Sequence, residues 1–316
     1  EDEVIKAEPI STYQVKGGMM YDINSDVSVF FNTGMVEKAP IMDNVIYFDG
    51  TVASDPANEK FLHNEFGVNY RFGKLGINAS AYNTDWQDRN LTKSVTTGQG
   101  DSGDTDVIFL TGVNQKHSGV ELETNYMVND MLDLMFVASF GNWKFDGDAN
   151  GNYQETEYNS EGQAIGYTTT EYAYALDGLY VGDMPQTSYV LGVTLKPIKD
   201  LRIQAIHKMY DKNYSDWSPS AREFDGTNDD ADRAQVWEAP SYNRLDLHMS
   251  YKLPKVKDLD MMLTANIFNV LDEVYVQDAV DNSQYNGYGS KQHLPHNAEV
   301  FLGTPRYANI GLSIGF

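Results

Sequence analysis

The sequence predicts an all-β protein, and more specifically the wall of a transmembrane antiparallel β-barrel. Apolar and polar residues alternate with a period of two along most of the chain, as in Val120-Glu121-Leu122-Glu123. The alternating segments are long, and the connections between them are short and long in turn. No stretch approaches the roughly 18 apolar residues of a membrane-spanning helix, so strands would have to make any crossing of a bilayer.

About eleven strands follow from this alternation, each with one apolar and one polar face, because successive side chains point to opposite sides of a sheet. They are expected at residues 11–23, 26–36, 59–72, 75–90, 105–128, 132–145, 184–197, 201–216, 241–253, 258–277 and 304–316. Many exceed the five or six residues of a typical strand, which favours a membrane barrel. Aromatic residues near the strand ends match the interfacial girdles of such barrels, among them Trp86, Trp143 and Phe145.

The connections fall into two classes that would lie at opposite rims of a barrel. Short turns are expected near 24–25, 73–74, 129–131, 198–200 and 254–257, and long loops near 37–58, 91–104, 146–183, 217–240 and 278–303. Outer-membrane barrels have short periplasmic turns and long extracellular loops, so we assign the two sets to those sides. A soluble β-rich binding protein is the alternative, and partitioning into detergent micelles would distinguish the two.

The composition excludes several functional classes. The 316 residues include 46 acidic and 23 basic side chains, a net charge of −23, so nucleic acid is not an expected partner. Cysteine is absent, which excludes disulfides and thiol catalysis. No G-x-S-x-G, P-loop or H-E-x-x-H motif occurs, and we expect no enzyme. No signal peptide follows Glu1, which fits a cytoplasmic chain, a mature chain or a piece of a longer one.

Four segments share the sequence pattern of one known family. They are residues 64–70 (NEFGVNY), 118–123 (SGVELE), 266–275 (NIFNVLDEVY) and 303–316 (GTPRYANIGLSIGF). In this order they resemble the C-terminal barrel of TonB-dependent receptors, the outer-membrane active transporters of Gram-negative bacteria, in a style closest to the Bacteroidetes. The resemblance implies that residues 1–316 supply about eleven of 22 barrel strands, with the plug domain not in this chain. Eleven strands would leave two bare edges, so we expect a partial receptor barrel.

The resemblance also implies a function in the bacterial outer membrane: TonB-dependent uptake of a scarce nutrient, with a ferric siderophore as the first expectation. Implied partners are the TonB complex acting through the plug, outer-membrane lipid and lipopolysaccharide, the barrel-assembly machinery and a surface lipoprotein. Import of an oligosaccharide, cobalamin or haem stays open, as does a passive porin-like or surface-binding barrel. Acidic loops disfavour a strongly anionic ligand, which would call for Arg and Lys.

Loop 146–183 contains six tyrosines and no Lys or Arg. Tyrosine offers a flat, amphipathic surface for contact with a ligand, and functional residues concentrate on loops. The ligand-binding candidates are therefore loop aromatic residues and one loop histidine: Tyr153, Tyr158, Tyr167, Tyr172, Tyr174, Trp217 and His293. For His293 an exposed loop histidine without a ligand is the alternative.

The same loop has the spacing of a calcium site, D-x-D-x-N-G-x5-E. The candidate ligands carry oxygen at alternate positions and are Asp146, Asp148, Asn150, Asn152 and Glu157. No helix is expected on either side, and a solvated acidic turn is the alternative. Calcium is the one candidate cofactor, and none is required for the expected function.

Phe316 ends the chain after a strand in which every second residue is apolar. This ending resembles the assembly signal that the barrel-insertion machinery reads in outer-membrane barrels. Phe316 is therefore the candidate assembly residue.

Overall fold

The computed structural model describes residues 4–47, 50–54, 56–96, 105–224, 231–255, 257–283, 285–287 and 290–315. Within these residues the chain is nearly all β, as the alternation predicts. The exceptions are the four-residue helix α1 (Pro219–Arg222) and the single 3-10 turns η1 (Met42–Asn44) and η2 (Pro295–Asn297). None of the described helices has the length and apolar character that crossing a bilayer requires.

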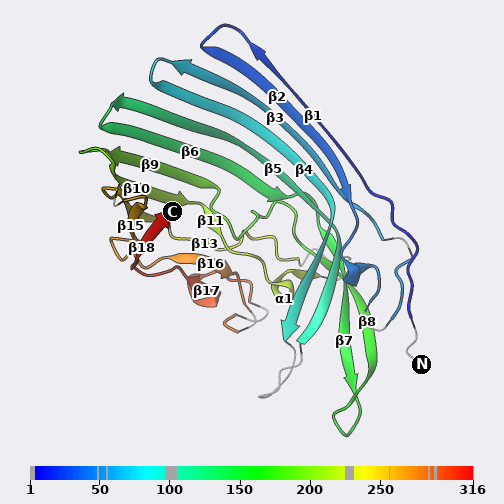
Figure 1. The fold of residues 1–316 in the computed structure, drawn as a ribbon. Helices are drawn as coiled ribbons and strands as arrows, with labels where there is room; N and C mark the ends of the chain where they lie inside the picture. The colour runs from blue at the N-terminus through cyan, green and yellow to red at the C-terminus, as the bar shows by residue number, and fades with distance from the viewer. Residues whose placement is uncertain are drawn as a thin grey trace.

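A large antiparallel sheet forms a curved wall (Figure 1). Its main path follows the chain order through β1 (Tyr13–Asp22), β2 (Val27–Lys38), β3 (Glu59–Phe72), β4 (Leu75–Thr96), β5 (Thr105–Asn129), β6 (Leu132–Phe145), β9 (Thr187–Leu195), β10 (Leu201–Asp211), β14 (Tyr242–Lys252), β15 (Asp260–Phe268) and β18 (Tyr307–Gly315). The path contains eleven strands and the whole sheet 14. The wall is not closed, because among the described residues β1 pairs only with β2, and β18 only with β15.

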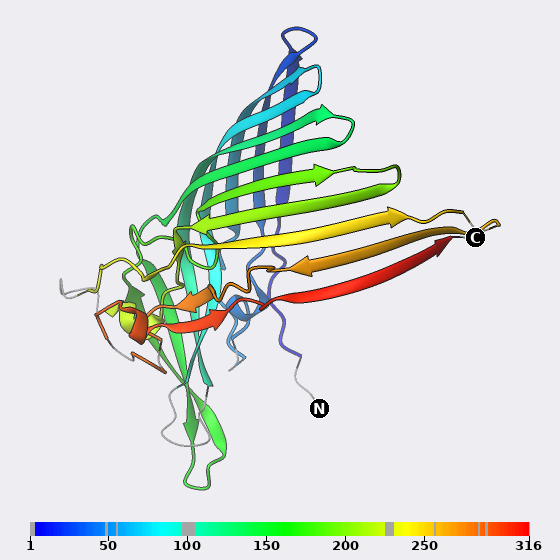
Figure 2. The ribbon, with the colours of Figure 1, turned by 90° about the vertical axis from the view of Figure 1, so that its left-hand side faces the viewer.

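Short and long connections lie at opposite ends of the wall (Figure 2). The short ones are held by local hydrogen bonds. The side-chain oxygen of Asn24 accepts from the backbone N–H groups of Asp26 and Val27, at 2.8 and 2.9 Å, and Asn129 accepts from Met131 at 2.8 Å. Such Asx turns reverse the chain in a few residues.

The expected loops contain more strand than the alternation indicates. β4 continues into the segment 91–104 as far as Thr96, and the segment 146–183 contains the hairpin β7 (Ala149–Tyr158) and β8 (Ala164–Tyr174). The first part of β5, residues 107–111, pairs with β7. The hairpin has polar residues on both faces, as in Gln154-Glu155-Thr156-Glu157, so no apolar alternation marks it.

Two expected strands are instead broken. Residues 201–216 divide into β10 and β11 (Asn213–Tyr214), and residues 258–277 divide into β15 and β16 (Val276–Val280). The breaks coincide with left-handed backbone at Lys212 (φ 53°), and at Asn269 and Asp272 (φ 50° and 55°). Positive φ lies outside the β region, so the backbone leaves its extended path at these residues.

The remaining strands are short. β12 (Glu223–Phe224) pairs with β8, β13 (Glu238–Ala239) pairs with β11, and β17 (Glu299–Leu302) pairs with β16. β12 therefore ties two long connections together, whereas the other two pairings each lie within one connection.

The register keeps one face of the wall apolar and the other polar. Leu122 lies opposite Ala79 on β4 and Ala138 on β6, whereas Glu121 lies opposite Ser80 and Ser139. Large apolar side chains such as Phe66, Val120 and Leu191 are half exposed on the apolar face. The assignment of Leu122 and Glu121 to opposite faces is confirmed.

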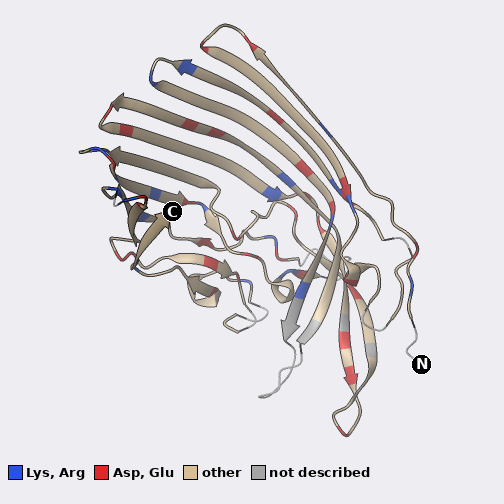
Figure 3. Cartoon of the chain, in the orientation of Figure 1, with Lys and Arg blue, Asp and Glu red and all other residues tan. Residues whose placement is uncertain are grey.

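The main hydrophobic core lies among the long connections rather than within the wall. It contains Ile108, Leu110, Val113, Phe145, Ala149, Tyr174, Leu176, Leu179, Tyr214, Trp217 and Val236. We call the packed connections the loop layer, meaning residues 105–114, 145–186, 212–224, 231–240, 276–283 and 290–302. Charged residues are frequent there and at strand ends, while most of the wall is uncharged (Figure 3).

Candidate functional site

A row of four rings crosses the polar face of the wall next to the loop layer. It joins Phe61 on β3, Trp86 on β4, His117 on β5 and Trp143 on β6, with ring centroids 4.4, 6.5 and 5.6 Å apart. The register produces this row, because Phe61 lies opposite Trp86, and His117 lies opposite Trp143. We call these four residues the aromatic row. Trp86 and Trp143 therefore belong to the polar face and not to a lipid-facing girdle.

Hydrogen bonds and one cation fix the rings of the aromatic row. The Arg89 guanidinium lies 4.2 Å from the Trp86 centroid and donates from Nη1 to Gln115 Oε1 at 3.3 Å. His117 Nε2 lies 3.1 Å from the same oxygen. The indole N–H of Trp143 donates to the Tyr82 hydroxyl at 2.9 Å. The rings are thus held before any ligand arrives.

Two buried donors beside the row have no partner within the described residues. They are Trp86 Nε1 and Gln115 Nε2. Both atoms have almost no accessible surface, so they do not face a ligand directly. The face of Trp86 and the charge of Arg89 can hold a planar group that carries oxygen.

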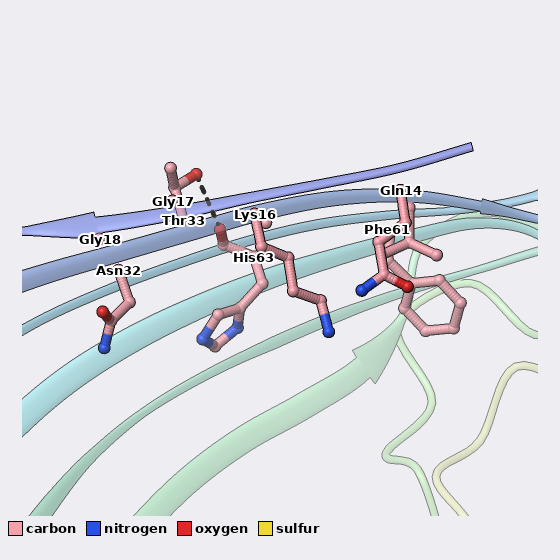
Figure 4. Close-up of a pocket in the computed structure, with 10 residues that line it drawn as sticks. Gln14, Lys16, Gly17, Gly18, Asn32, Thr33, Phe61 and His63 are labelled. Atoms are coloured by element: carbon pink, nitrogen blue, oxygen red, sulfur yellow. Dashed lines mark hydrogen bonds between the residues drawn. The ribbon is translucent and has the colours of Figure 1, made fainter.

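The row ends at a hollow of about 760 Å³ on β1, β2 and β3. Lys16, Asn32, Phe61 and His63 line it from the same side of the strands, whereas Thr33 projects from the other side (Figure 4). His63 Nδ1 lies 2.8 Å from the Thr84 hydroxyl. Phe61 is shared, so the hollow and the aromatic row form one continuous surface.

The loop layer packs against this polar side of the wall. Phe145 follows Trp143 by two residues on β6 and so points to the same face, and its side chain is buried in the loop-layer core. Phe145 is therefore a core residue rather than part of an interfacial girdle. The aromatic row lies between the packed connections and the open part of the polar face.

The structure places the sequence-predicted ligand residues in different environments. Tyr174 and Trp217 are 0% and 2% exposed, with rings 5.9 Å apart in the loop-layer core, so neither presents a surface to a ligand. Tyr153 and Tyr172 are half-buried neighbours on β7 and β8, 6.3 Å apart. Tyr158 is exposed near the end of the hairpin. The side chain of Tyr167 lies outside the described residues.

His293 is buried as well, with its imidazole between the carboxylates of Asp232 and Asp281. The candidates from the loops thus do not meet in one site. Loop composition directed the prediction to them, whereas the aromatic row lies on strands. The sequence signal for the row was the position of Trp86, His117 and Trp143, which fall on the polar face of the expected strands.

The two aspartates of the calcium motif are paired with cations from other segments. Asp146 lies 2.7 Å from Lys116 Nζ, and Asp148 accepts two hydrogen bonds from Arg233, at 2.9 and 2.8 Å. The segment itself has no Lys or Arg, so this neutralisation is invisible in its local sequence. The Arg233 hydrogen bonds hold the pKa of Asp148 below its usual value, although burial opposes the shift.

The other calcium candidates lie along β7, so they do not converge. At about 3.3 Å per residue, Asn150 and Glu157 are roughly 23 Å apart, whereas calcium ligands lie about 2.3–2.6 Å from the ion. Asn152 lies between them. Among the described residues no group of three or more His, Asp or Glu side chains is arranged to hold a metal. Calcium binding stays a prediction, and one ion could join the whole set only if β7 refolded.

Comparison with known proteins connects this architecture to one family. A family model described as TonB dependent receptor-like, beta-barrel, matches residues 11–270. No curated protein matches the sequence. Solved structures similar to the chain include the ferric-catecholate import receptor Fiu of Escherichia coli K12, with 14% identity and a TM-score of 0.55 over 95% of this chain and 34% of Fiu.

Two further solved structures are similar to the chain at comparable identity, TM-score and coverage. The siderophore receptor PiuA from Acinetobacter baumannii has 18% identity and a TM-score of 0.56, over 96% of this chain and 35% of PiuA. A mutant of the ferric enterobactin receptor PfeA from Pseudomonas aeruginosa has 14% identity and a TM-score of 0.59, over 96% of this chain and 40% of PfeA. At these identities the similarity is one of fold, and the chain spans about a third to two-fifths of each structure.

Proposed function

Because the chain belongs to the family of TonB-dependent receptor β-barrels, we propose that it is part of an outer-membrane receptor for active import of a scarce nutrient. Barrels of this family are bacterial outer-membrane proteins, and the family is one of transport receptors rather than enzymes. In the proposed receptor the wall is the C-terminal half of a 22-stranded barrel. A plug inside the barrel would connect ligand binding to the TonB complex.

The proposed ligand is a ferric siderophore with planar, oxygen-bearing groups. The observation that carries this proposal is the aromatic row, with the guanidinium of Arg89 over the ring of Trp86. Aromatic faces bind planar groups, and the guanidinium of Arg89 supplies local positive charge for anionic oxygen atoms that the acidic loops alone would repel. Relatives named for ferric catecholates and ferric enterobactin agree with this ligand class.

The faces of the wall support the proposed orientation. The face of Glu121 and the aromatic row would line the lumen, and the face of Leu122 would contact lipid. In this orientation the loop layer is extracellular. Lipopolysaccharide beside the apolar face, the barrel-assembly machinery and a surface lipoprotein over the loop layer are the further partners that we propose.

Uptake measurements test the transport proposal. Cells that carry the complete receptor should accumulate iron-55 from a catecholate siderophore, and deletion of TonB should abolish accumulation while leaving surface binding intact. Accumulation that persists without TonB would contradict active transport and indicate a passive barrel.

Substitution of the aromatic row tests the ligand. Trp86→Ala with Trp143→Ala should weaken siderophore binding at least about tenfold, which corresponds to about 1.4 kcal/mol. The matched control is Phe140→Ala, which removes a ring from the apolar face of β6. Equal affinity of all three proteins would contradict a role of the row in binding.

A further inference from the structure

Four ionisable side chains form a buried ionic cluster in the loop layer. Arg222, Asp232, Asp281 and His293 have side-chain exposures of 0%, 6%, 1% and 7%. They come from α1, from the segment before β13, from the residue after β16 and from the segment before η2. The cluster therefore joins two long connections, 212–240 and 276–302, that are far apart in the sequence.

Arg222 provides one half of the connection. Its Nη1 donates to the carbonyl oxygens of Asp232 and Ala234, at 2.9 and 2.7 Å. The guanidinium also lies 3.4 Å from the carboxylate of Asp281 and 3.6 Å from that of Asp232. These contacts fix the segment 231–236 against α1.

His293 provides the other half, with one carboxylate at each ring nitrogen. Nδ1 lies 2.5 Å from Asp281 Oδ2, and Nε2 lies 2.7 Å from Asp232 Oδ2. A neutral imidazole has only one N–H, so it would turn a lone pair toward one of these carboxylates. Both contacts are favourable only when the ring is the doubly protonated imidazolium.

The charges agree with this protonation state. Two carboxylates face one guanidinium and one imidazolium, so the protonated cluster is neutral. Arg222 Nη2 and Asn282 Nδ2 also approach Nδ1, at 3.2 and 3.1 Å, and they oppose its proton. The carboxylate of Asp281 is nearer than either. Loss of the proton would leave a buried net negative charge, which is strongly unfavourable away from water.

The backbone at the cluster is also held in an uncommon conformation. His293 and Asn282 have φ of 47° and 44°, in the left-handed region that non-glycine residues seldom adopt. Such positions persist when surrounding contacts hold them. Release of the cluster would let both positions relax.

We propose that the buried ionic cluster is a proton-operated latch, closed when His293 is protonated, which locks residues 231–236 to residues 281–283 and 290–297 in the loop layer. The closed state of the latch follows from the contacts of His293 and Arg222 alone.

The pH dependence follows from the groups that face His293, namely Asp281, Asp232 and Arg222. Burial lowers the pKa of His293, but the hydrogen bond and charge of Asp281, with the hydrogen bond of Asp232, outweigh burial and Arg222 and raise it above 6.5. A histidine with a raised pKa in the folded state stabilises that state below pH 6.5, and the stabilisation is lost as the pH rises through the raised pKa. The latch should therefore open as the pH rises above the raised pKa of His293.

Hydrogen exchange of the complete receptor in detergent tests the latch. Between about pH 5 and about pH 9, corrected for intrinsic exchange, peptides covering 231–236 and 281–283 should show a step of at least about tenfold in exchange rate. His293→Gln should exchange at the fast rate at every pH, whereas the control His117→Gln should keep the step. Absence of the step in the wild type, or its persistence in His293→Gln, would overturn the proposal.

A second variant keeps the test decisive if His293→Gln does not fold. Asp232→Asn removes one carboxylate that favours the imidazolium, so its step should move to lower pH. A step at unchanged pH would overturn the latch. Neither readout involves transport, so a failure of the siderophore proposal would leave these results unaffected.

Discussion

Asp183 shows how the loop layer changes the chemistry of a single side chain. It lies near Asp216 and Asp278, which belong to other connections, and Lys93 forms an ion pair with Asp216. Burial first, then the charge of Asp216 and a hydrogen bond with Asp278, raise the pKa of Asp183 to about 7. A shared proton between Asp183 and Asp278 reduces the repulsion among the three carboxyl groups.

Asp183→Asn should remove one source of pH-dependent stability. A carboxyl whose pKa is raised in the folded state stabilises that state at low pH, and the contribution is lost as pH rises from 3.8 through about 7. The wild type should therefore lose stability over this range with a slope of at most about 1.4 kcal/mol per pH unit.

The variant should have a flatter profile, measured as melting temperature against pH. Asn also tolerates the left-handed backbone at this position, where φ is 71°. Asp130→Asn is the matched control, because that carboxylate is fully exposed at a turn. Identical profiles for wild type and Asp183→Asn would contradict the raised pKa.

At the scale of the elements, adjacent residues of β5 point to opposite faces of the wall, one apolar and one polar. Leu122→Arg would place a charge on the apolar face near the middle of the strand and should cost about 2–4 kcal/mol in the membrane. Glu123→Arg on the polar face should cost much less. Unfolding of the complete receptor from lipid bilayers measures both costs, and the opposite order would mean that the apolar face does not contact lipid.

The hairpin β7–β8 carries the calcium prediction. Binding to the acidic set should be weak, on the order of 10⁻⁴–10⁻³ M, because no helix preorganises it and the ligands lie along an extended strand. Isothermal titration of the wild type against Asp146→Ala/Asp148→Ala measures this. Identical heats would contradict the calcium interpretation and leave the two aspartates as ion-pair partners of Lys116 and Arg233.

The wall was predictable from the sequence because a two-sided sheet requires alternating polarity. The same rule assigned Leu122 and Glu121 to their faces without knowledge of their neighbours. It could not locate the left-handed residues Lys212 and Asn269, since nothing in a polar pattern encodes the sign of φ.

The candidate site was harder to predict, because its parts come from several connections or strands. Arg233 neutralises Asp148 from 85 residues away, and Asp232 and Asp281 enclose His293 from distances of 61 and 12 residues. The local sequence around each of these residues therefore does not contain the side chain that pairs with it. The aromatic row has the same character, since its four residues come from four strands and only the register aligns them.

At the scale of the whole molecule, the wall ends in two edges, β1 and β18, with no further strand among the described residues. An unpaired edge exposes backbone N–H and C=O groups, which lipid cannot satisfy. Assembly into a closed barrel is therefore the condition under which this wall would be stable in a membrane.

Deletion of Phe316 tests the assembly signal, which lies outside the described residues. The apolar residues 308, 310, 312 and 314 share one face of β18, and the family resemblance assigns the final aromatic residue to recognition by the insertion machinery. The deletion should lower the amount of folded barrel in the outer membrane, measured by heat-modifiable electrophoresis. Phe316→Tyr is the control that keeps an aromatic end. An unchanged amount after deletion would contradict the signal.

The core of the loop layer has a consequence for how new specificities could arise. Ile108, Tyr174 and Trp217 come from three different connections and fill one interior, so none of these connections can be replaced without leaving a cavity or a clash for the others. A chimaera that receives a single connection from another receptor should misfold at this end, whereas one that receives the whole set should fold. Recombination among such genes would then preserve the connections as one inherited block, while the wall beneath could diverge strand by strand.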